Sequence, residues 1–347
     1  MLSPRKIKDK LPMTEKQKAF IDRGRQTLRD LITGQDPRLA IILGPCSIHD
    51  LSAALEYARR VRVLAEEVAS TCVLVMRVYI EKPRTVTGWK GLAYDPHLDG
   101  SNDIQTGIFW ARELFLTLTD LGIPIATEFL NPLLIPYIQD LVSWGFIGAR
   151  TSASQPHREM ASLLPCPMGF KNSPDGNIEQ AIHAMIAART THRFPFINEE
   201  GYLSLTESPG NPYTHVVLRG SHQGINYDPA SLAETVHTME LHGLKNRILV
   251  DCSHGNCSKE YTKQKDVFQR VLEQYDQGND KILGMMIESH LEEGSQHLSE
   301  SPSELNYAVS ITDPCLGWVE TENLIRSAAE SLKSRNGSWI QPRKATF

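Results

Sequence analysis

Apolar residues along the chain fall into short, nearly continuous runs separated by longer amphipathic stretches. Eight runs have the length and composition of buried strands: residues 39–46, 73–80, 123–129, 146–150, 168–172, 214–220, 247–254 and 282–289. Stretches with helical periodicity lie among them, at residues 52–70, 103–122, 177–190, 229–243 and 321–335. Strands that are apolar throughout are typical of a parallel sheet covered by helices. The pattern therefore predicts an α/β protein.

Eight buried strands, each followed by helical pattern, favour a (β/α)8 TIM barrel over its main competitor, a doubly wound sheet. Two additions to the barrel are expected. A helix is predicted within residues 14–34, with a capping box of Thr14 and Gln17 at its start and Gly34 at its end. Residues 193–213 have the pattern of a β-hairpin inserted before strand six. The predicted division is an N-terminal extension (1–34), a catalytic barrel with the hairpin (35–335) and a C-terminal tail (336–347).

Composition narrows the class of protein. The chain has 347 residues, enough for a large core, and its 41% hydrophobic and 22% charged residues are typical of a soluble globular protein. A formal net charge of -5 gives no basic field for nucleic acid or a membrane surface, and no run of about 18 apolar residues occurs. Six scattered cysteines do not form a secreted disulfide framework. We expect a cytoplasmic protein with mostly reduced thiols that binds neither nucleic acid nor membranes.

An ionisable or metal-binding side chain stands at the end of every predicted strand. In chain order these residues are Cys46, Arg77, Glu128, Arg150, Lys171, Arg219, His254 and Glu288. Barrel active sites are built at the carboxyl ends of the strands. A single polar residue there would be ordinary, because loops are polar. Eight of eight, each directly after apolar residues, indicate one site that gathers them.

Four of these residues are cations, and they predict a site for a polyanion. The four are Arg77, Arg150, Lys171 and Arg219, and Lys82 and Arg84 join them from the loop after the second strand. So much positive charge in one cavity would repel itself unless an anionic ligand neutralised it. Arginine suits phosphate and carboxylate, and lysine adds a point charge. The alternative is that each cation pairs with a nearby carboxylate for structural reasons.

The remaining residues suggest a metal site without establishing one. Cys46, His254 and Glu288, with Asp313 as a fourth, would suit Mn, Fe, Co, Zn or Cu. However, the ligands are dispersed along the chain, and neither a CxxC nor an HExxH motif occurs. Cys46 could instead pack in the barrel, and His254 could be a general base or a structural histidine. The residues alone leave these alternatives open.

Other candidate residues carry less weight. Cys252 has the same strand parity as His254 and is expected to fill the layer below it. His49 and Asp50 could simply cap the next helix, although a nucleophilic Cys46–His49 pair is conceivable. The sequence contains neither GxGxxG nor GxxxxGK[ST], so it supports neither a dinucleotide site nor a P-loop.

Short motifs spread over residues 14–335 carry a family resemblance. In order they are GPCSIHD, MRVYIEKPRT followed by GWKGLAYDP, GART, GFKN, LRG, DCSHGNCSK, ESH and SITDPCLGW. Together they resemble the class I 3-deoxy-D-arabino-heptulosonate 7-phosphate (DAHP) synthases of bacteria and fungi. The resemblance implies a TIM barrel that condenses phosphoenolpyruvate with erythrose 4-phosphate and releases phosphate, at the entry to the shikimate pathway.

The resemblance also implies roles for individual residues. One divalent metal ion, Mn2+, Fe2+, Co2+ or Zn2+, would be bound by Cys46, His254, Glu288 and Asp313. Phosphoenolpyruvate would be held by Arg77, Glu128, Arg150, Lys171 and Arg219. Erythrose 4-phosphate would be held by Lys82, Pro83, Arg84 and Thr85, with Asp313. Lys82 is the expected acid for the new hydroxyl, and His254 a second proton carrier.

Several stretches depart from the family pattern. Ala153 stands where a glutamate is common, KPRTVTGWKG is an atypical spelling, and FKNSPDG and LRGSHQGINY replace more usual forms. These changes put kinetics and acceptor preference in question. The resemblance further implies a homodimer or homotetramer and an aromatic amino acid effector bound near the N-terminal segment and the hairpin.

Three rival functions remain from the sequence. One is a related phosphoenolpyruvate–aldose phosphate synthase with another acceptor, against which the KPRT motif argues. Another is a Schiff-base aldolase that uses Lys171 and no metal. The third is a non-catalytic paralogue that senses an effector, against which the intact cation and metal sets argue.

Overall fold

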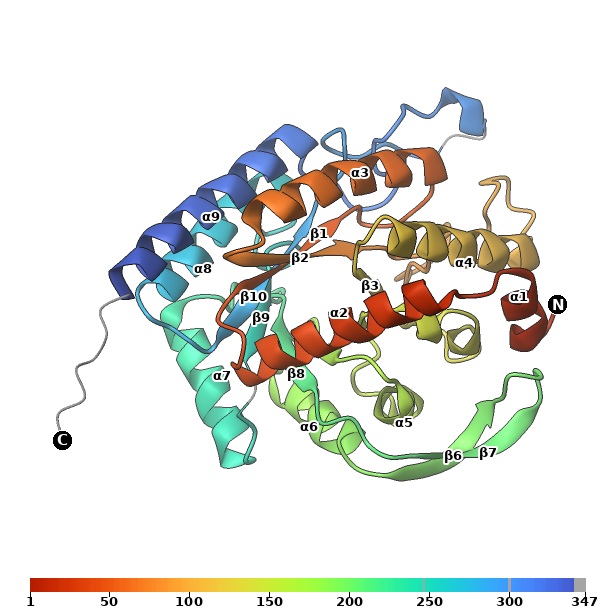
Figure 1. The fold of residues 1–347 in the computed structure, drawn as a ribbon, viewed down its shortest axis with the longest axis horizontal. Coiled ribbons are helices and arrows are strands. Elements are labelled where there is room, and N and C mark those ends of the chain that lie inside the picture. Colours follow the sequence, from red (N-terminus) through yellow and green to blue (C-terminus); the bar gives the residue numbers. More distant parts are fainter. Residues whose placement is uncertain (246, 299–300, 340–347) are drawn as a thin grey trace.

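The structure, a computed structural model that describes residues 1–245, 247–298 and 301–339, is built around a closed parallel barrel (Figure 1). Its strands are β1 (Leu39–Gly44), β2 (Cys72–Arg77), β3 (Ile125–Glu128), β4 (Trp144–Ile147), β5 (Met168–Lys171), β8 (Thr214–Leu218), β9 (Ile248–Asp251) and β10 (Ile282–Glu288). Around the barrel they follow the order β1-β10-β9-β8-β5-β4-β3-β2, so the first and last strands are neighbours. The predicted TIM barrel is confirmed.

Helices surround the barrel (Figure 1). They are α3 (Leu51–Val68), α4 (Ile104–Asp120), α5 (Gln155–Leu163), α6 (Glu179–Ala188), α7 (Pro229–Leu241), α8 (Gln264–Asp276) and α9 (Trp318–Trp339). One connection departs from the expected pattern, because β3 is followed by two 3-10 turns, η1 (Ile135–Tyr137) and η2 (Gln139–Leu141). Pro132 and Pro136 lie in this connection, and proline removes a donor that a longer helix would need. Two further 3-10 turns are η3 (Tyr261–Lys263) and η4 (Pro302–Glu304).

Alternate strand residues fill the barrel interior, and helix α2 (Glu15–Thr33) closes one end of it. The interior cluster takes Ala40 and Ile42 from β1, and it includes Leu28, Leu31 and Ile32 of α2. The other strand residues pack outward against the helices. The predicted capping box and the left-handed glycine at the end of α2 are confirmed. Because α2 covers one end of the barrel, a site among the described residues is expected at the other end, where the polar strand ends lie.

The hairpin and the N-terminal helix contact each other. Strands β6 (His192–Ile197) and β7 (Leu203–Ser208) pair antiparallel, and their tip lies beside α1 (Pro4–Lys10) in Figure 1. The Arg5 amide donates to the Glu199 carbonyl at 2.8 Å, and Lys8 Nζ lies 2.7 Å from Glu199 Oε1. At the other end of the chain, α9 continues to Trp339, within the segment assigned to the tail. The rest of that tail, residues 340–347, lies outside the described residues.

Among the described residues, no helix combines the length and apolar character that a membrane span needs.

Candidate active site

A cavity of about 560 Å³ opens at the carboxyl ends of the barrel strands. All the predicted site residues except Cys46 line it: Arg77, Lys82, Pro83, Arg84, Thr85, Glu128, Arg150, Lys171, Arg219, His254, Glu288 and Asp313. Cys46 is fully buried, and its sulfur lies 2.9 Å from Lys82 Nζ, a group that does line the cavity. The strand ends therefore converge on one site, as the sequence pattern indicated.

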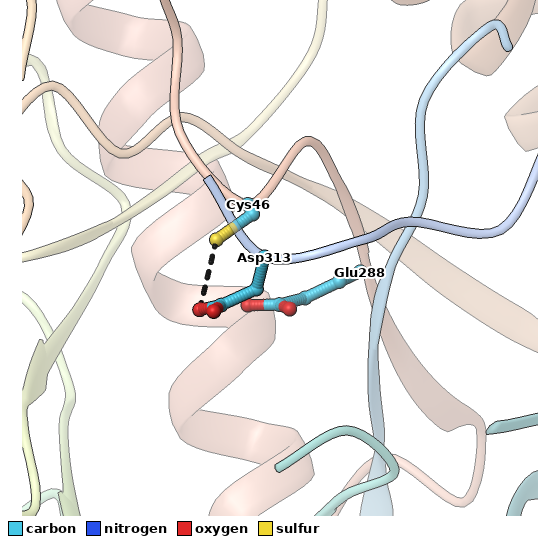
Figure 2. A group of neighbouring side chains, drawn as sticks. All are labelled: Cys46, Glu288 and Asp313. Atoms are coloured by element: carbon cyan, nitrogen blue, oxygen red, sulfur yellow. Dashed lines mark hydrogen bonds between the residues drawn. The ribbon is translucent and has the colours of Figure 1, made fainter. Parts of the chain in front are cut away.

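Three of the four predicted metal ligands are gathered in one group. Cys46, Glu288 and Asp313 each offer a ligand atom, and these atoms lie within 4.8 Å of one another (Figure 2). Register explains part of this arrangement, because Gly44 of β1 pairs with Glu288 of β10 and Cys46 follows two residues later. Asp313 comes from the segment that precedes α9. The Cys46 sulfur is 3.5 Å from Asp313 Oδ2.

This group carries negative charge that a cation can neutralise. Lys82 Nζ lies 2.9 Å from Cys46 Sγ and 2.7 Å from Asp313 Oδ2, so an ammonium already occupies part of the space between two of the donors. Burial, together with the charge of Glu288, raises the pKa of the Cys46 thiol to about 11. Burial would also raise the pKa of Asp313, but the Lys82 ammonium outweighs it and holds that pKa well below its usual range. A thiolate and two carboxylates fit a divalent transition metal, whose own charge would favour the thiolate.

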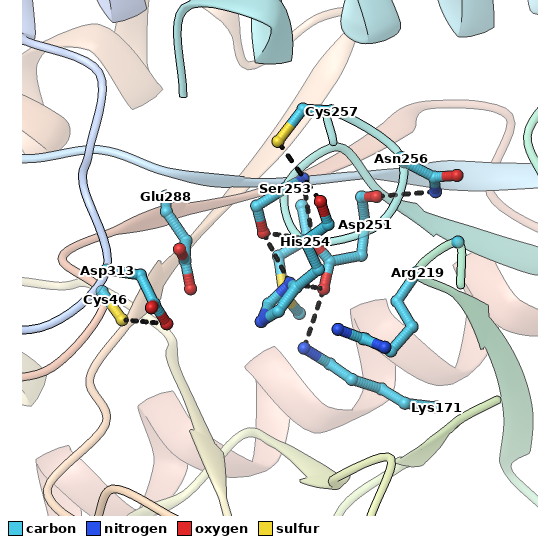
Figure 3. Close-up of polar contacts among 12 residues, drawn as sticks. Cys46, Lys171, Arg219, Asp251, Ser253, His254, Asn256, Cys257, Glu288 and Asp313 are labelled. Atoms are coloured by element: carbon cyan, nitrogen blue, oxygen red, sulfur yellow. Dashed lines mark hydrogen bonds and ion pairs between the residues drawn. The ribbon is translucent and has the colours of Figure 1, made fainter. Parts of the chain in front are cut away.

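His254, the fourth predicted ligand, lies outside that group of three. It follows β9 in a turn, where its φ of 59° is uncommon for a residue other than glycine. Its Nδ1 is 3.0 Å from Asp251 Oδ2 and 2.8 Å from Ser253 Oγ (Figure 3). With Nδ1 engaged, Nε2 is the ring nitrogen that could bind a metal or carry a proton.

The four strand-end cations divide into two paired and two unpaired groups. Arg77 is buried, with Nη2 2.8 Å from Glu288 Oε1 and its guanidinium 3.6 Å from the centre of the Tyr79 ring. Lys171 Nζ is 2.8 Å from Asp251 Oδ2. For these two residues the structural alternative, pairing with a carboxylate, describes what is seen.

Arg150 and Arg219 make no ion pair within the part of the chain that the structure describes. Arg150 Nη2 donates to Thr85 Oγ1 at 2.8 Å, which connects the β4 end to the KPRT loop. Burial lowers the pKa of Arg219, and the like charge of Arg150 adds to this effect. Asp251 opposes this shift without forming an ion pair with Arg219. Two neighbouring guanidinium groups without an ion pair in a cavity are suited to bind an anion.

Asp251 is a site residue that the sequence analysis missed, and it corrects the expectation for Cys252. The interior position below His254 is filled by Asp251, which is fully buried, whereas Cys252 belongs to the cluster between strands and helices. The parity prediction was wrong because β9 ends at Asp251 and the chain turns before His254. An acidic residue directly after the apolar run ILV was the signal that could have identified it.

Comparisons with known proteins place the chain in a family. The family model of the DAHP synthetase I family matches residues 10–326. A Tyr-sensitive phospho-2-dehydro-3-deoxyheptonate aldolase of Escherichia coli K12 is 48% identical, over 96% of this chain and 94% of its own. A Trp-sensitive aldolase of the same strain is 43% identical over 96% of each chain. The solved structure of the aldolase from Francisella tularensis SCHU S4 superposes with a TM-score of 0.94 at 36% identity, covering 96% of this chain and 97% of that one. The chain belongs to the DAHP synthetase I family, as its motifs predicted.

Proposed function

We propose that this chain condenses phosphoenolpyruvate with erythrose 4-phosphate to give DAHP and phosphate, the first step of the shikimate pathway. The observation that carries the proposal is the convergence of cations from β2, β4, β5 and β8 on one cavity in a member of this family. Both substrates are anions that repel each other in solution. Holding them side by side on fixed cations converts a bimolecular encounter into an oriented reaction.

The two subsites are assigned from the charge distribution. Phosphoenolpyruvate would be held by Arg150 and Arg219, with Lys171 beside them. Arg77 and Glu128 line the same cavity and would complete this subsite. The KPRT loop, residues 82–85, would receive the phosphate of the aldose. The bond from Arg150 to Thr85 connects the two subsites and supports this assignment.

The chemistry requires a new carbon–carbon bond and a proton for the aldehyde oxygen. Carbon 3 of phosphoenolpyruvate attacks the aldehyde carbon, and water adds to carbon 2. The bond between carbon 2 and the bridging oxygen then breaks, and phosphate leaves with that oxygen. Lys82 can donate the proton, because its Nζ lies in the cavity beside Asp313. His254 Nε2 can carry a second proton only when it is not bound to the metal, because its Nδ1 is engaged by Asp251. A divalent ion held by Cys46, Glu288 and Asp313, with His254 Nε2, would supply Lewis acidity toward the aldehyde oxygen.

The Schiff-base alternative is disfavoured by the pairing of Lys171. A nucleophilic lysine must present its amine to the substrate, whereas Lys171 Nζ is held 2.8 Å from the buried Asp251 carboxylate. We expect no covalent adduct when the protein is treated with phosphoenolpyruvate, the aldose phosphate and borohydride. A trapped adduct on Lys171 would overturn this part of the proposal.

Phosphate release tests the function directly. We expect release only when phosphoenolpyruvate and erythrose 4-phosphate are both present, loss of activity with EDTA, and recovery with Mn2+. Activity that survives thorough metal stripping would contradict the metal assignment. Faster turnover with a five-carbon aldose phosphate would favour the related synthase, and no turnover with any acceptor would favour the non-catalytic paralogue.

We also propose regulation by an aromatic amino acid and assembly into a dimer or tetramer. Adding phenylalanine, tyrosine or tryptophan to the same assay tests the effector, which we place near the contact of α1 with the hairpin. The hairpin exposes Tyr202, Leu203 and Leu205 by 72%, 70% and 62%, which gives an oligomer contact an apolar surface. Sedimentation of the purified chain tests the oligomeric state, and a monomer at assay concentration would contradict it.

A further inference from the structure

Asp251 contacts both halves of the site at once. It is the last residue of β9, its side chain is fully buried, and it contacts both Lys171 and His254 (Figure 3). One carboxylate oxygen, Oδ2, accepts a hydrogen bond from Lys171 Nζ at 2.8 Å and lies 3.0 Å from His254 Nδ1. A single oxygen is therefore shared between a residue proposed to hold phosphoenolpyruvate and one proposed to bind the metal.

The carboxylate is held firmly in that position. Its other oxygen, Oδ1, accepts from the Ser253 amide at 3.0 Å and from the Ser253 hydroxyl. The Asp251 carbonyl also accepts from Asn256 Nδ2 at 2.9 Å. Because Oδ1 is fully engaged, Asp251 cannot rotate to follow one partner, and its charge must be divided between Lys171 and His254.

We propose that Asp251 is a positioning residue that couples occupancy of the phosphoenolpyruvate subsite to metal affinity at the neighbouring site. Without a ligand, the Lys171 ammonium neutralises much of the carboxylate charge. A bound anion draws on the same ammonium, so more of that charge acts on the His254 Nδ1–H bond. The imidazole then becomes a stronger donor through Nε2, as in other carboxylate–histidine–metal arrangements. Each ligand should therefore tighten the binding of the other by the same factor.

This inference rests on the proposed function, because it assumes that both ligands bind. The sign of the effect is fixed by charge: phosphoenolpyruvate should raise metal affinity. Direct attraction between the anion and the metal would have the same sign, so the test must separate that contribution from the one carried by Asp251.

The test measures free Mn2+ by electron paramagnetic resonance during titration of the metal-stripped protein, with and without phosphoenolpyruvate and with no aldose phosphate. We expect phosphoenolpyruvate to raise Mn2+ affinity about tenfold in the unmodified protein, within the usual range of coupling. In Asp251→Asn the factor should fall to about twofold or less, because the shared charge is gone. Asp175→Asn is the matched control: it changes net charge equally, from the loop after β5, and should keep the full factor.

The outcomes are distinct. Full coupling in Asp251→Asn would show that direct attraction suffices and would overturn the role of Asp251. Binding of both ligands without any coupling in the unmodified protein would overturn the inference and leave the proposed function intact. Binding of neither ligand would overturn the proposed function itself. Should Asp251→Asn fail to fold by circular dichroism, Asp251→Glu replaces it. The longer carboxylate cannot keep one oxygen on both Lys171 and His254, so the factor should again fall to about twofold or less, and full coupling in this variant would overturn the role of Asp251.

Discussion

Lys82 occupies the boundary between the sugar phosphate loop and the candidate metal ligands. Its ammonium contacts Cys46 and Asp313, and the rest of its loop lines the substrate cavity. We expect Lys82→Met to lower kcat by at least about a hundredfold, typical for loss of an acid group, with little change in phosphoenolpyruvate affinity. A phosphate-release assay measures kcat, and titration calorimetry measures the affinity for phosphoenolpyruvate.

The matched control for this variant is Lys90→Met, in the same loop but exposed, where kcat should remain unchanged. Near-normal turnover of Lys82→Met would remove the residue from the mechanism.

Cys46 is one of six buried free cysteines in the chain, but its surroundings differ from those of the others. Its sulfur lies near the carboxylates of Glu288 and Asp313. We expect Cys46→Ser to weaken Mn2+ binding at least about tenfold, since a hydroxyl is a poorer ligand than a thiolate. Titrating the metal-stripped variant with Mn2+, and measuring free Mn2+ by electron paramagnetic resonance, gives its affinity for the metal.

Cys72→Ser provides the comparison, because Cys72 is also buried but begins β2, away from the site. Equal metal affinity in both variants would return Cys46 to the role of a packed core thiol.

At the residue scale, the sequence predicted which side chains meet but not how they are shared. Strand ends and family motifs identified most of the charged residues that line the cavity, but they missed Asp251 beneath it and lining residues such as Tyr261 and Gln264. The pairing of Lys171 with Asp251, and the separation of His254 from the three clustered donors, depend on turns whose geometry is set by tertiary contacts. The φ of 59° at His254 is one such feature that no local pattern predicts.

At the scale of elements, β1 and β10 pair with Ala40 opposite Gly284, where there is no room for a side chain. A Cβ added at Gly284 would collide with the carbonyl oxygen of Ala40 in the neighbouring strand. We expect Gly284→Ala to lower the free energy of unfolding by about 2 kcal/mol or more, because the barrel wall must move. Urea unfolding measures the loss.

Gly24→Ala, in helix α2, is the control for that substitution. Its Cβ would lie 3.4 Å from Ser143 Oγ, at ordinary contact distance, and alanine is the better helix former. This variant should be no less stable than the unmodified protein. An equal loss of stability in both variants would contradict the account of the β1–β10 contact.

The elements themselves were largely predictable, because buried parallel strands and amphipathic helices differ in period and length. The exception lies between β3 and β4, where the helical pattern expected after every strand is absent and two 3-10 turns, η1 and η2, are found. There, apolar residues continue while the prolines interrupt the backbone donors. In this segment the hydrophobic pattern favours a helix, whereas the prolines lack the backbone donors that a helix needs, so only short 3-10 turns form.

For the whole molecule, buried histidines make stability depend on pH. His215 is fully buried in β8, with its Nε2 accepting from Trp144 Nε1 at 3.2 Å, and burial lowers its pKa to about 3. The unfolded chain takes up a proton near pH 6.5, whereas the folded chain does not. The stability that neutral His215 contributes is therefore complete above about pH 6.5. It is lost as the pH falls toward 3, so the free energy of unfolding decreases by up to about 1.4 kcal/mol per pH unit.

His215→Gln removes this titration, so we expect a flatter dependence of unfolding free energy on pH between 6.5 and 4, even where the variant is less stable overall. His237→Gln, at an exposed position of α7, should leave the slope unchanged. Identical slopes in the unmodified protein and His215→Gln would contradict the assignment. Urea midpoints at each pH provide the data.

The meeting of β1 and β10 also bears on how the chain is made. During synthesis β1 emerges early, yet its partner is not complete until residue 288, and Asp313 follows later still. Contacts so distant in sequence form slowly, because the closure of a long loop costs entropy before the contacts compensate for it. Cys46 and Glu288 lie on the two sides of this closing seam, so an ion bound between them would join the earliest and latest parts of the barrel. Metal supply would then influence how long a newly made chain remains open to proteases, and not only how fast the finished enzyme works.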